Sequence, residues 1–468
     1  MYYRNERVVM NNIDRLLQAI KQPTTDDPYR LHYHLMPPIG WLNDPNGLCQ
    51  HDGTYHIYYQ WAPADVNNGL KGWGHYATKD FIHYQDLKMP LLPDHPRDQG
   101  GAYSGSAIIK NNKIHYFYTG NVKKPGDYDY ILKGREHNLM HVESCDGHIL
   151  TNKECLMTNE DYPDDLTLHV RDPKIYHRDH DYLVMGARDK QDVGQVLVYQ
   201  SDDLKKFDYC CRLKTEKPFG YMWECPDLFE LNGQMILLCS PQGIKQDGYL
   251  YENIYQNGYF KVNYDFVNDP IVKDFEEIDN GFDIYAAQTF LDEQGRRILI
   301  GWMGLPDVDY TNPTVQNNWQ HALTMPRILD YHDGHLYQKT LPEFKQLRMS
   351  QESYKKPHLQ LKNNVFELQI KNISDTLYLK LRNDFIIEYH NGLMTLTMNE
   401  SGYGRDIRHL ELEHLDSLII YSDTSSIEMF INDGYRTFTT RIYSDNTDIE
   451  CSNEMNIYYL DSFKIESE

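Results

Sequence analysis

The stretch GTYHIYYQ, residues 53–60, couples a tight polar turn to a tyrosine-rich apolar run, which is typical of a β-hairpin whose exit strand is buried. Four later segments repeat this arrangement. The turn residues and the runs after them are Gly53 with TYHIYYQ, Lys113 with IHYFYTG, Asp181 with YLVMGA, Gly233 with QMILLCS and Gly295 with RRILIGW. Successive turns are 60, 68, 52 and 62 residues apart, so the chain contains an internal repeat.

Each repeat is long enough for one four-stranded sheet. A single sheet of this kind cannot bury both of its faces, and stacking the sheets around a common axis solves that problem. Strand-like runs rich in Tyr, Ile, Val and Leu alternate with Gly, Asn and Asp turns along the chain. The sequence therefore predicts an all-β protein with a five-bladed β-propeller over residues 28–348.

Carboxylates occupy three of five corresponding places in the repeat. Counting back nine residues from each turn residue reaches Asp44, Ser104, Asp172, Glu224 and Ala286. Because the first strand of each propeller blade lines the central channel, we expect these positions to ring one end of that channel. A single acid before a turn often only caps backbone amides, but three acids at one offset favour a functional site.

Three acids in one cavity cannot all ionise at low cost, so their pKa values should separate. One can then act as a nucleophile and another as a proton donor, which is the pair that glycoside hydrolysis needs. The rival interpretation is a Ca²⁺ or Mg²⁺ site. The sequence has no D-x-D-x-D loop and no His at ligand spacing from these acids, so we expect neither a metal nor a cofactor.

Aromatic and polar residues crowd the three acids. They are Trp41, Trp61, Trp73, Tyr103 and Trp223, with Asn43, Gln60 and Arg171 beside them. Flat rings can stack on the C–H faces of a sugar while polar side chains bond its hydroxyls, although core packing explains any single ring equally well. Of the six tryptophans in the chain, five lie in these segments or in the later motif at Trp302, which favours a carbohydrate site.

Three motifs in the chain resemble the catalytic motifs of glycoside hydrolase family 32, the invertases and sucrose-6-phosphate hydrolases. They are WLNDPNG at 41–47, HVRDPK at 169–174 and MWECPDLF at 222–229. Supporting segments in the family's order are GAYSGSA at 101–107, GFDIYAAQ at 281–288, GWMG at 301–304, QHALTMPR at 320–327 and FINDGYRTFTTRI at 430–442. The sequence departs from the family at Ala287, where Pro is usual, and at Asn68, where an aromatic residue or His is common.

The resemblance implies a retaining β-fructofuranosidase built from a propeller and an appended β-sandwich. Asp44 would be the nucleophile, Glu224 the acid and base, and Asp172 the carboxylate that stabilises the transition state. The substrate site would be lined by Trp41, Leu42, Asn43, Gln60, Trp73, Tyr103, Ser104, Arg171 and Trp302.

Residues 349–468 lack the repeat. Period-two runs such as NVFELQI, FIIEYH, SIEMFI and NIYYLDSFKI, with turns at Asn391-Gly392 and Asp433-Gly434, predict an antiparallel β-sandwich. We expect this domain to pack against the propeller and stabilise it. Carbohydrate binding is the alternative role.

The N-terminal residues 1–27 predict a short amphipathic helix, because Val9, Ile13, Leu16, Leu17 and Ile20 recur at helical spacing. This segment lacks the apolar core of a signal peptide, and no stretch of the chain is long and apolar enough to span a membrane. The eight cysteines are scattered and form no C-x-x-C pair, which indicates reduced thiols. We therefore expect a cytoplasmic protein with no membrane partner.

The formal net charge of −23 opposes binding to nucleic acid. The resemblance and the expected location predict a small-molecule substrate, sucrose 6-phosphate, cleaved to fructose and glucose 6-phosphate. Its phosphate would need a basic patch, for which Lys123, Lys124, Lys133 and Arg135 are candidates, although solvated loop residues give the same pattern. The alternatives are an invertase, a fructan hydrolase or a fructosyltransferase acting on unphosphorylated sugars, and a non-catalytic sugar-binding propeller. The sequence leaves the oligomeric state open.

Overall fold

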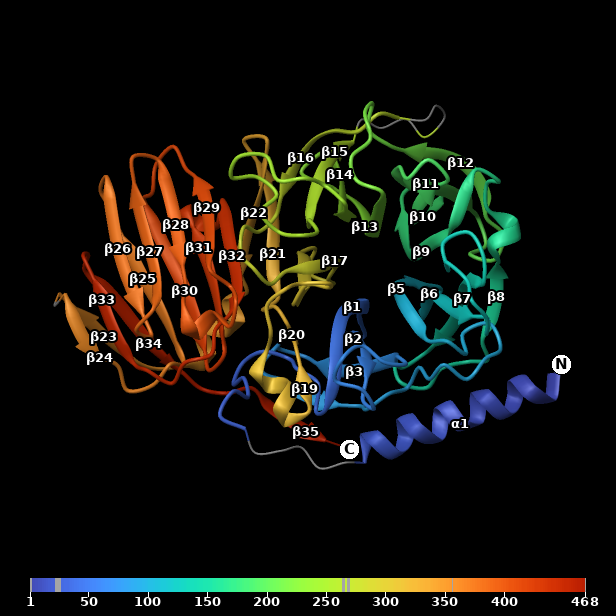
Figure 1. The fold of residues 1–468 in the computed structure, drawn as a ribbon, viewed down its shortest axis with the longest axis horizontal. Coiled ribbons are helices and arrows are strands. Elements are labelled where there is room, and N and C mark those ends of the chain that lie inside the picture. The colour runs from blue at the N-terminus through green and yellow to red at the C-terminus, as the bar shows by residue number, and fades with distance from the viewer. Residues whose placement is uncertain (1, 22–26, 263–265, 267–269, 356, 468) are drawn as a thin grey trace.

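The structure is a computed structural model that describes residues 2–21, 27–262, 266, 270–355 and 357–467. Figure 1 shows a ring of small sheets with a two-layered sandwich beside it and one long helix, α1 (Tyr2–Ile20), at the lower edge. The short 3₁₀ helices are η1 (Asn159–Asp161), η2 (Pro313–Asn317), η3 (Pro342–Leu347), η4 (Glu400–Gly402) and η5 (Asn432–Gly434).

The ring consists, within the described residues, of five sheets that follow one another along the chain. The first sheet contains β1 (Gly40–His51), β2 (Thr54–Ala62), β3 (Gly72–Thr78) and β4 (His83–Asp86). The second contains β5 (Ala102–Lys110), β6 (Lys113–Lys123), β7 (Arg135–Ser144) and β8 (Glu154–Met157). The third contains β9 (Leu166–His177), β10 (Asp181–Asp189), β11 (Gly194–Ser201) and β12 (Asp208–Leu213). The last two are β13 (Met222–Leu231), β14 (Gln234–Gln242), β15 (Gly258–Val262) and β16 (Lys273–Glu277); and β17 (Tyr285–Leu291), β18 (Arg297–Met303), β21 (Arg327–His332) and β22 (His335–Thr340), with β20 (Ala322–Leu323) on β18.

The first strand of each sheet is its innermost strand. Strands β1, β5, β9, β13 and β17 contact one another in order around the ring, and in Figure 1 their labels surround its centre. This arrangement confirms the predicted five-bladed propeller. The turn-and-strand repeat supplies the second strand of each blade, since β2, β6, β10, β14 and β18 coincide with the five apolar runs.

The first blade receives strands from two distant parts of the chain. Strand β19 (Trp319–Gln320) pairs in parallel with β1, and β35 (Lys464–Ser467) pairs in parallel with β4. The prediction that the C-terminal residues belong entirely to the sandwich is therefore wrong for β35. Strand β35 covers the edge of β4, whose backbone groups would otherwise be left to solvent.

The sandwich contains two six-stranded antiparallel sheets among the described residues. One is β23 (Arg348–Tyr354), β34 (Met455–Leu460), β25 (Phe366–Lys371), β30 (Ser417–Asp423), β31 (Ser426–Ile431) and β32 (Arg436–Arg441). The other is β24 (His358–Gln360), β33 (Asp448–Cys451), β26 (Thr376–Leu381), β27 (Phe385–His390), β28 (Leu393–Thr397) and β29 (Ile407–Glu411). Alternate residues of these strands, such as Leu377, Leu379 and Leu381, fill the core between the sheets.

The predicted sandwich turns are confirmed. Asn391 and Gly392 have φ values of 52° and 80°, the pair of positive angles that a two-residue hairpin turn requires. Asp433 and Gly434, at 56° and 91°, connect β31 to β32.

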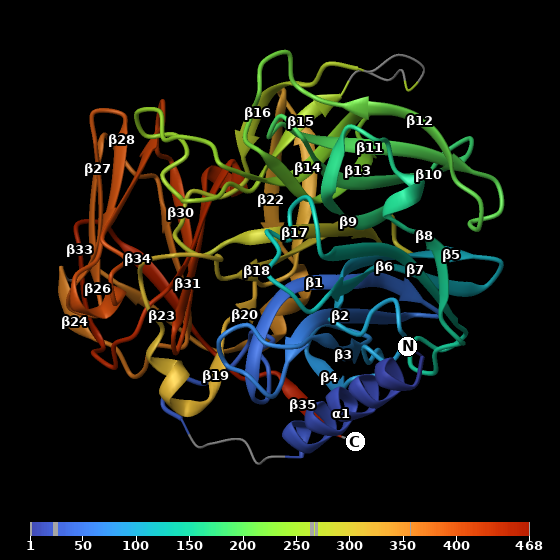
Figure 2. The same cartoon turned by 45° about the vertical axis from the view of Figure 1, so that its right-hand side comes forward.

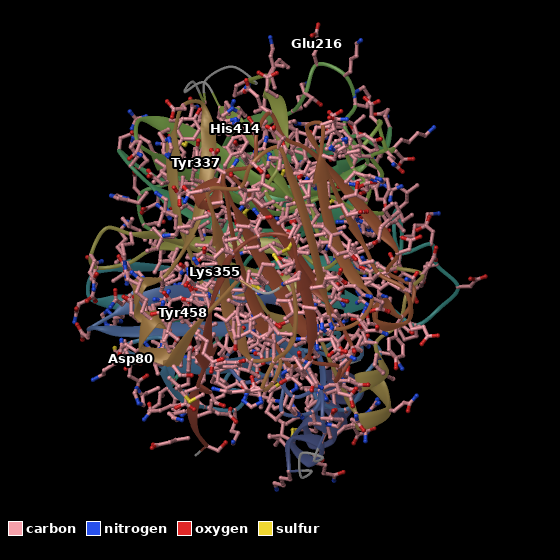
Figure 3. All side chains as sticks on the ribbon, turned by 90° about the vertical axis from the view of Figure 1, so that its left-hand side faces the viewer. Asp80, Glu216, Tyr337, Lys355, His414 and Tyr458 are labelled. Atoms are coloured by element: carbon pink, nitrogen blue, oxygen red, sulfur yellow. The ribbon has the colours of Figure 1, made fainter. Side chains whose placement is uncertain are left out.

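A buried polar network joins the propeller to the sandwich. Arg327 of β21 donates to Glu428 Oε2 of β31 at 2.6 Å, and His34 lies between Glu428 Oε1 and Asp423 Oδ2, at 2.9 Å from each. All four side chains are fully buried. If one charge of this network were lost, its buried partners would be left unpaired at a high cost in free energy. The network therefore fixes the relative position of the two domains. Figure 3 looks onto the outer side of the sandwich and labels Tyr337 of β22 and His414, which both line a cavity between the propeller and the sandwich.

Helix α1 lies along the lower edge of the ring, beside β4 and β35 (Figure 2). Val9 and Leu16 are buried, while Leu17 is exposed, so the apolar stripe is narrower than the sequence pattern predicts. Leu16 packs into the core of the propeller, and Asn12 Nδ2 donates to the carbonyl of Gln99. None of the described helices is long and apolar enough to cross a membrane.

Candidate active site

Every innermost strand carries a β-bulge at the same depth in the channel. The pairing of these strands skips between residues 42 and 45, 102 and 105, 171 and 174, 224 and 227, and 285 and 288. At each place three steps along the inner strand match two steps along its neighbour. A bulge re-aims side chains and is common beside active sites, and all three acids lie in or beside these bulges.

The bulges correct one prediction, namely that the three acids occupy equivalent positions. Glu224 opens its bulge, Asp172 is the next position in its own, and Asp44 is the position after that. Counting from the turns concealed this difference because the stretch of inner strand between the bulge and the hairpin varies: it runs from Pro45 to His51 in the first blade, with a second bulge in it, but only from Asp227 to Leu231 in the fourth. The side chains of the three acids still converge, because the bulge in each blade directs its own acid into the same space although the three acids occupy successive bulge positions.

The acids converge on a pocket of about 170 Å³ at one end of the channel. Ten of the expected residues line it: Trp41, Asn43, Asp44, Gln60, Tyr103, Ser104, Arg171, Asp172, Glu224 and Trp302. The lining also contains Asn68, Lys71, Arg135, Gln242, Tyr285 and Pro306. Trp41 and Trp302 contact each other edge to face in the pocket wall, with ring centroids 5.7 Å apart.

Leu42 and Trp73 do not line the pocket, which corrects the expectation that they contact substrate. Leu42 stands between Trp41 and Asn43 on the same strand, so its side chain points away into the propeller core. Trp73 is buried behind the wall, and its Nε1 donates to the carbonyl of Tyr103 at 3.0 Å. Both residues support the wall. Trp61 and Trp223 are likewise core residues, as the packing alternative predicts.

Asp44 is held by donors on both carboxylate oxygens. Asn43 Nδ2 donates to Oδ1 at 3.0 Å, while Ser104 Oγ and Gln60 Nε2 donate to Oδ2, the latter at 3.3 Å. Burial raises the pKa of Asp44, and the bonds from Ser104 and Asn43 oppose that rise because they favour the charged form. Fixed donors therefore orient an ionisable carboxylate in a largely buried site, which suits a nucleophile.

Glu224 has a different set of partners. Arg171 donates from Nε and Nη2 to Oε1 at 3.1 and 2.6 Å, and Oε2 accepts from Gln242 Nε2 at 2.7 Å and from the Tyr285 hydroxyl at 2.6 Å. This carboxyl group is thus held from both sides, with a cation on one oxygen and neutral donors on the other. Two acids with such distinct surroundings can take distinct roles in proton transfer.

Asp172 is the most enclosed of the three acids. Its Oδ2 accepts from the backbone N–H of Cys225 at 3.0 Å, and its own N–H donates to Thr119 Oγ1 at 2.8 Å. Burial raises the pKa of Asp172; Arg171 opposes this rise, whereas the charges of Glu224 and Asp44 add to it. Asp172 and Cys225 both have positive φ, 64° and 48°, a backbone strain that is typical of functional sites.

Cys225 is a buried thiol beside two of the acids. Its Sγ lies 3.5 Å from Asp44 Oδ2, and burial raises the pKa of this thiol. A neutral thiol in this place is a poor nucleophile. Cys225 therefore shapes the pocket and does not take part in the chemistry as a nucleophile.

Sequence reasoning missed Lys71, Gln242 and Tyr285. Tyr285 occupies the first bulge position of β17, the place that Glu224 takes in β13, so a bulge-based alignment of the repeat would have identified it. Gln242 is the last residue of β14 and Lys71 lies just before β3. Neither belongs to a motif, so only the folded chain places them at the pocket.

The four basic candidates for a phosphate site separate in the structure. Arg135 lines the pocket. Lys124 pairs with Glu136 at 3.0 Å on the surface, Lys123 Nζ lies 5.3 Å from the centroid of the Tyr130 ring, and Lys133 is exposed; none of these three lines the pocket.

A possible metal-ligand group lies away from these acids. His115, His141 and Glu143 of β6 and β7 are the one set of three candidate ligands found among the described residues. Lys205 Nζ donates to His141 Nδ1 at 3.0 Å, which requires that nitrogen to be unprotonated and leaves the other, Nε2, protonated and facing His115. Because both ring nitrogens of His141 already have partners, this group is better explained as a hydrogen-bonded histidine pair.

A propeller channel that ends in separately held carboxylates has the equipment of a glycosidase. Two family models match the chain: the glycosyl hydrolases family 32 N-terminal domain over residues 34–340 and the glycosyl hydrolases family 32 C terminal over residues 345–467. The chain belongs to glycoside hydrolase family 32, and it is a glycosidase.

Relatives and solved structures agree with this assignment. The chain is 36% identical to the sucrose-6-phosphate hydrolase of Bacillus subtilis (strain 168) over 448 residues, covering 90% of this chain and 91% of the relative. It is 37% identical to that of Vibrio alginolyticus over 463 residues, covering 95% and 92%. Among solved structures, the sucrose-6-phosphate hydrolase of Lactobacillus gasseri matches with a TM-score of 0.86 at 29% identity, covering 98% and 96% of the two chains. A GH32 β-fructofuranosidase of Bombyx mori matches with a TM-score of 0.81 at 28% identity over both whole chains.

Proposed function

We propose that this glycosidase hydrolyses the β-fructofuranosidic bond of sucrose 6-phosphate to release fructose and glucose 6-phosphate. The observation that carries the choice of substrate is a pair of cations, Lys71 and Arg135, in the wall of the acid-lined pocket. Neither forms an ion pair with any described carboxylate, although the whole chain carries a net charge of −23. Free cations in such a protein favour an anionic substrate group.

In the proposed reaction, Asp44 attacks the anomeric carbon of the fructosyl unit while Glu224 donates a proton to the departing glycosidic oxygen. The C–O bond to glucose 6-phosphate breaks, and an ester forms between fructose and Asp44. Glu224, now a carboxylate, takes a proton from water, which attacks the same carbon and frees Asp44. Two displacements retain the configuration at that carbon.

Asp172 and Arg171 have supporting roles in the proposal. Asp172 accepts hydrogen bonds from fructose hydroxyls and stabilises the positive charge that develops on the ring. Arg171 orients Glu224 through its two bonds to Oε1. Trp41 and Trp302 give the sugar an apolar face to pack on, while Asn43, Gln60 and Ser104 hold Asp44.

Lys71 and Arg135 would bind the phosphate. Lys71 is only 8% exposed, and burial lowers the pKa of its ammonium group to about 8 even though the charges of Asp44 and Glu224 raise it. Arg135 Nε is buried and has no hydrogen-bond partner among the described residues. A buried, unpartnered donor costs free energy until a ligand satisfies it. A ligand group with several acceptor oxygens therefore stabilises this wall most.

We also propose that the protein is cytoplasmic, which is supported by its eight cysteines, all of which are free thiols. We further propose that residues 28–348 carry the catalytic activity and that residues 349–468 stabilise them, because the three proposed catalytic acids all lie in the propeller strands.

The test is a comparison of kcat/KM for sucrose 6-phosphate and for sucrose with the purified protein. The proposal expects a clear preference for the phosphorylated sugar. Equal values would refute the phosphate assignment and leave an invertase. Product analysis at high sucrose separates the remaining alternative, since a fructosyltransferase gives oligosaccharides and a hydrolase gives free fructose.

A further inference from the structure

A second cavity, larger than the catalytic pocket, opens at one end of the sandwich. Its volume is about 660 Å³, within the range of about 300–1,000 Å³ that small-molecule sites occupy. Loops from both sheets of the sandwich form its walls, and Pro28, Tyr29 and His32 complete the lining. No residue in this lining also lines the catalytic pocket.

The wall of this cavity is fixed in place. Ser425 Oγ donates to the carbonyl of Tyr29 at 2.6 Å, and Asp423 accepts from the backbone N–H groups of His32 and Tyr33 at 2.9 and 3.0 Å. Arg382, which is 2% exposed, donates to the carbonyl of Thr424 at 2.7 Å. The cavity is therefore built into the junction.

Three lining residues, Ser401, Asp384 and Arg382, have polar atoms that the protein leaves unsatisfied; in Arg382 this atom is the donor Nε. Ser401 is 4% exposed, and its buried Oγ has no hydrogen-bond partner among the described residues. Asp384 accepts from the Ser401 N–H through Oδ2 at 2.9 Å, but its buried Oδ1 has no such partner. Orphaned buried groups of this kind are uncommon and are satisfied when a ligand supplies the missing donors and acceptors.

Tyrosine rings form the rest of the wall. Tyr443 contacts Tyr29 and Tyr403 edge to face, with centroids 5.3 and 5.4 Å away, and the Tyr403 ring is 40% exposed. Tyr403 and Arg382 hold positive φ angles of 52° and 49°, a conformation that side chains other than Gly and Asn rarely adopt. An aromatic surface beside hydroxyl and carboxylate acceptors is the arrangement that binds the C–H faces and hydroxyls of a sugar.

The charges in the wall decide which kind of sugar fits. Three acids, Asp384, Glu400 and Asp445, line the cavity together with two cations. Lys362 pairs with Glu352, and Arg382 bonds backbone carbonyls through its two Nη atoms, while its buried Nε has no partner among the described residues. Because the acids outnumber the cations, an anion would meet an excess of negative charge. The acids do not form a candidate three-ligand metal group within the described part of the chain, which argues against a cation.

We infer that this cavity is a non-catalytic binding site for a neutral, unphosphorylated mono- or disaccharide. The site goes beyond the proposed catalytic function and does not rest on it, because the two cavities share no residue.

The test is calorimetric titration of the Asp44→Ala protein with glucose, maltose and sucrose, and separately with sucrose 6-phosphate. At least one neutral sugar should bind at a site that sucrose 6-phosphate does not occupy. Adding Tyr403→Ala should weaken that binding by about tenfold or more, and adding Ser401→Ala should weaken it by about threefold to tenfold. In the otherwise native chain, both substitutions should leave hydrolysis unchanged.

Ser401→Ala also separates a binding role from a structural one. Its hydroxyl has no partner in the unliganded protein, so removing it should leave Tm unchanged or raise it. A fall in Tm would show that Ser401 serves the fold and would overturn the inference. Absence of neutral-sugar binding, binding unaffected by Tyr403→Ala, or binding of calcium alone that depends on Asp384 would each overturn it as well. Failure of the catalytic proposal would instead appear only in the hydrolysis rates.

Discussion

Replacing Lys71 by Met removes one buried positive charge from the pocket wall while keeping the length of the side chain. A hydrogen bond to a charged group contributes about 1.5–3 kcal/mol. The loss should therefore lower kcat/KM for sucrose 6-phosphate by about 10- to 150-fold. Because Lys71 is 8% exposed, solvent screens its charge poorly, which supports the upper part of that range.

The same reasoning predicts a pH dependence. Burial lowers the pKa of Lys71 to about 8, so in the free enzyme the ammonium form is lost as the pH rises through that value. The ratio of kcat/KM for sucrose 6-phosphate to that for sucrose should therefore fall above about pH 8. In the Lys71→Met protein this ratio should be low and independent of pH across that interval.

The assay is initial-rate kinetics with both substrates for the native protein and for Lys71→Met, Arg135→Met and Lys124→Met. Lys124 is the matched control, an exposed lysine that pairs with Glu136 outside the pocket. Its substitution should change neither rate. An equal loss of kcat/KM for sucrose and sucrose 6-phosphate in Lys71→Met would refute the reasoning, because Lys71 would then serve the catalytic acids and not the phosphate.

Four further predictions concern the acids, their support and the domain junction, two of them at the junction. Asp44→Ala and Glu224→Ala should each lower kcat by about 10³-fold or more, and azide should partly restore turnover to Asp44→Ala if the nucleophile is assigned correctly. His169→Phe should lower kcat about tenfold with little change in KM, because His169 Nδ1 accepts from Arg171 Nη1 at 2.7 Å and so aims Arg171 at Glu224; an unchanged kcat would contradict this. Glu428→Ala should lower the free energy of unfolding by about 3–5 kcal/mol, measured by denaturant titration, since it strands Arg327 and His34. The bonds to Asp423 and Glu428 outweigh burial and raise the pKa of His34, so its contribution to stability is complete below about pH 6.5 and is lost as the pH rises through the raised value; stability that increases over this interval in the native protein relative to His34→Gln would refute that sign.

The fold was predictable from the sequence because the hairpin signal is local. Each apolar run after a polar turn became the second strand of a blade, and the turn at Asn391-Gly392 has the angles that its residues favour. The strand at 464–467 was not predictable in the same way. Its pairing with β4 depends on which strand edge remains free after the propeller has closed.

For the active site, too, some features were predictable from the sequence and others were decided only by the tertiary structure. The motifs around Asp44, Asp172 and Glu224 identify the acids, and the repeat predicts that they meet. The register within each blade depends on hairpin lengths and bulges, which is why counting from the turns gave equivalent positions that the structure corrects. Leu42 shows the same limit, since the alternation of a strand decides which of two neighbours faces the pocket.

By itself, the sequence determined the all-β class, the five repeated blades, the acid triad and the acidic surface, because turn chemistry, strand periodicity and charge are properties of short segments. The tertiary structure alone decided that Lys71, Gln242 and Tyr285 join the acids, that Trp73 stands behind the wall, and that a second polar cavity forms at the end of the sandwich. These features bring together residues far apart in the chain, and only the packing of whole sheets sets which of them meet.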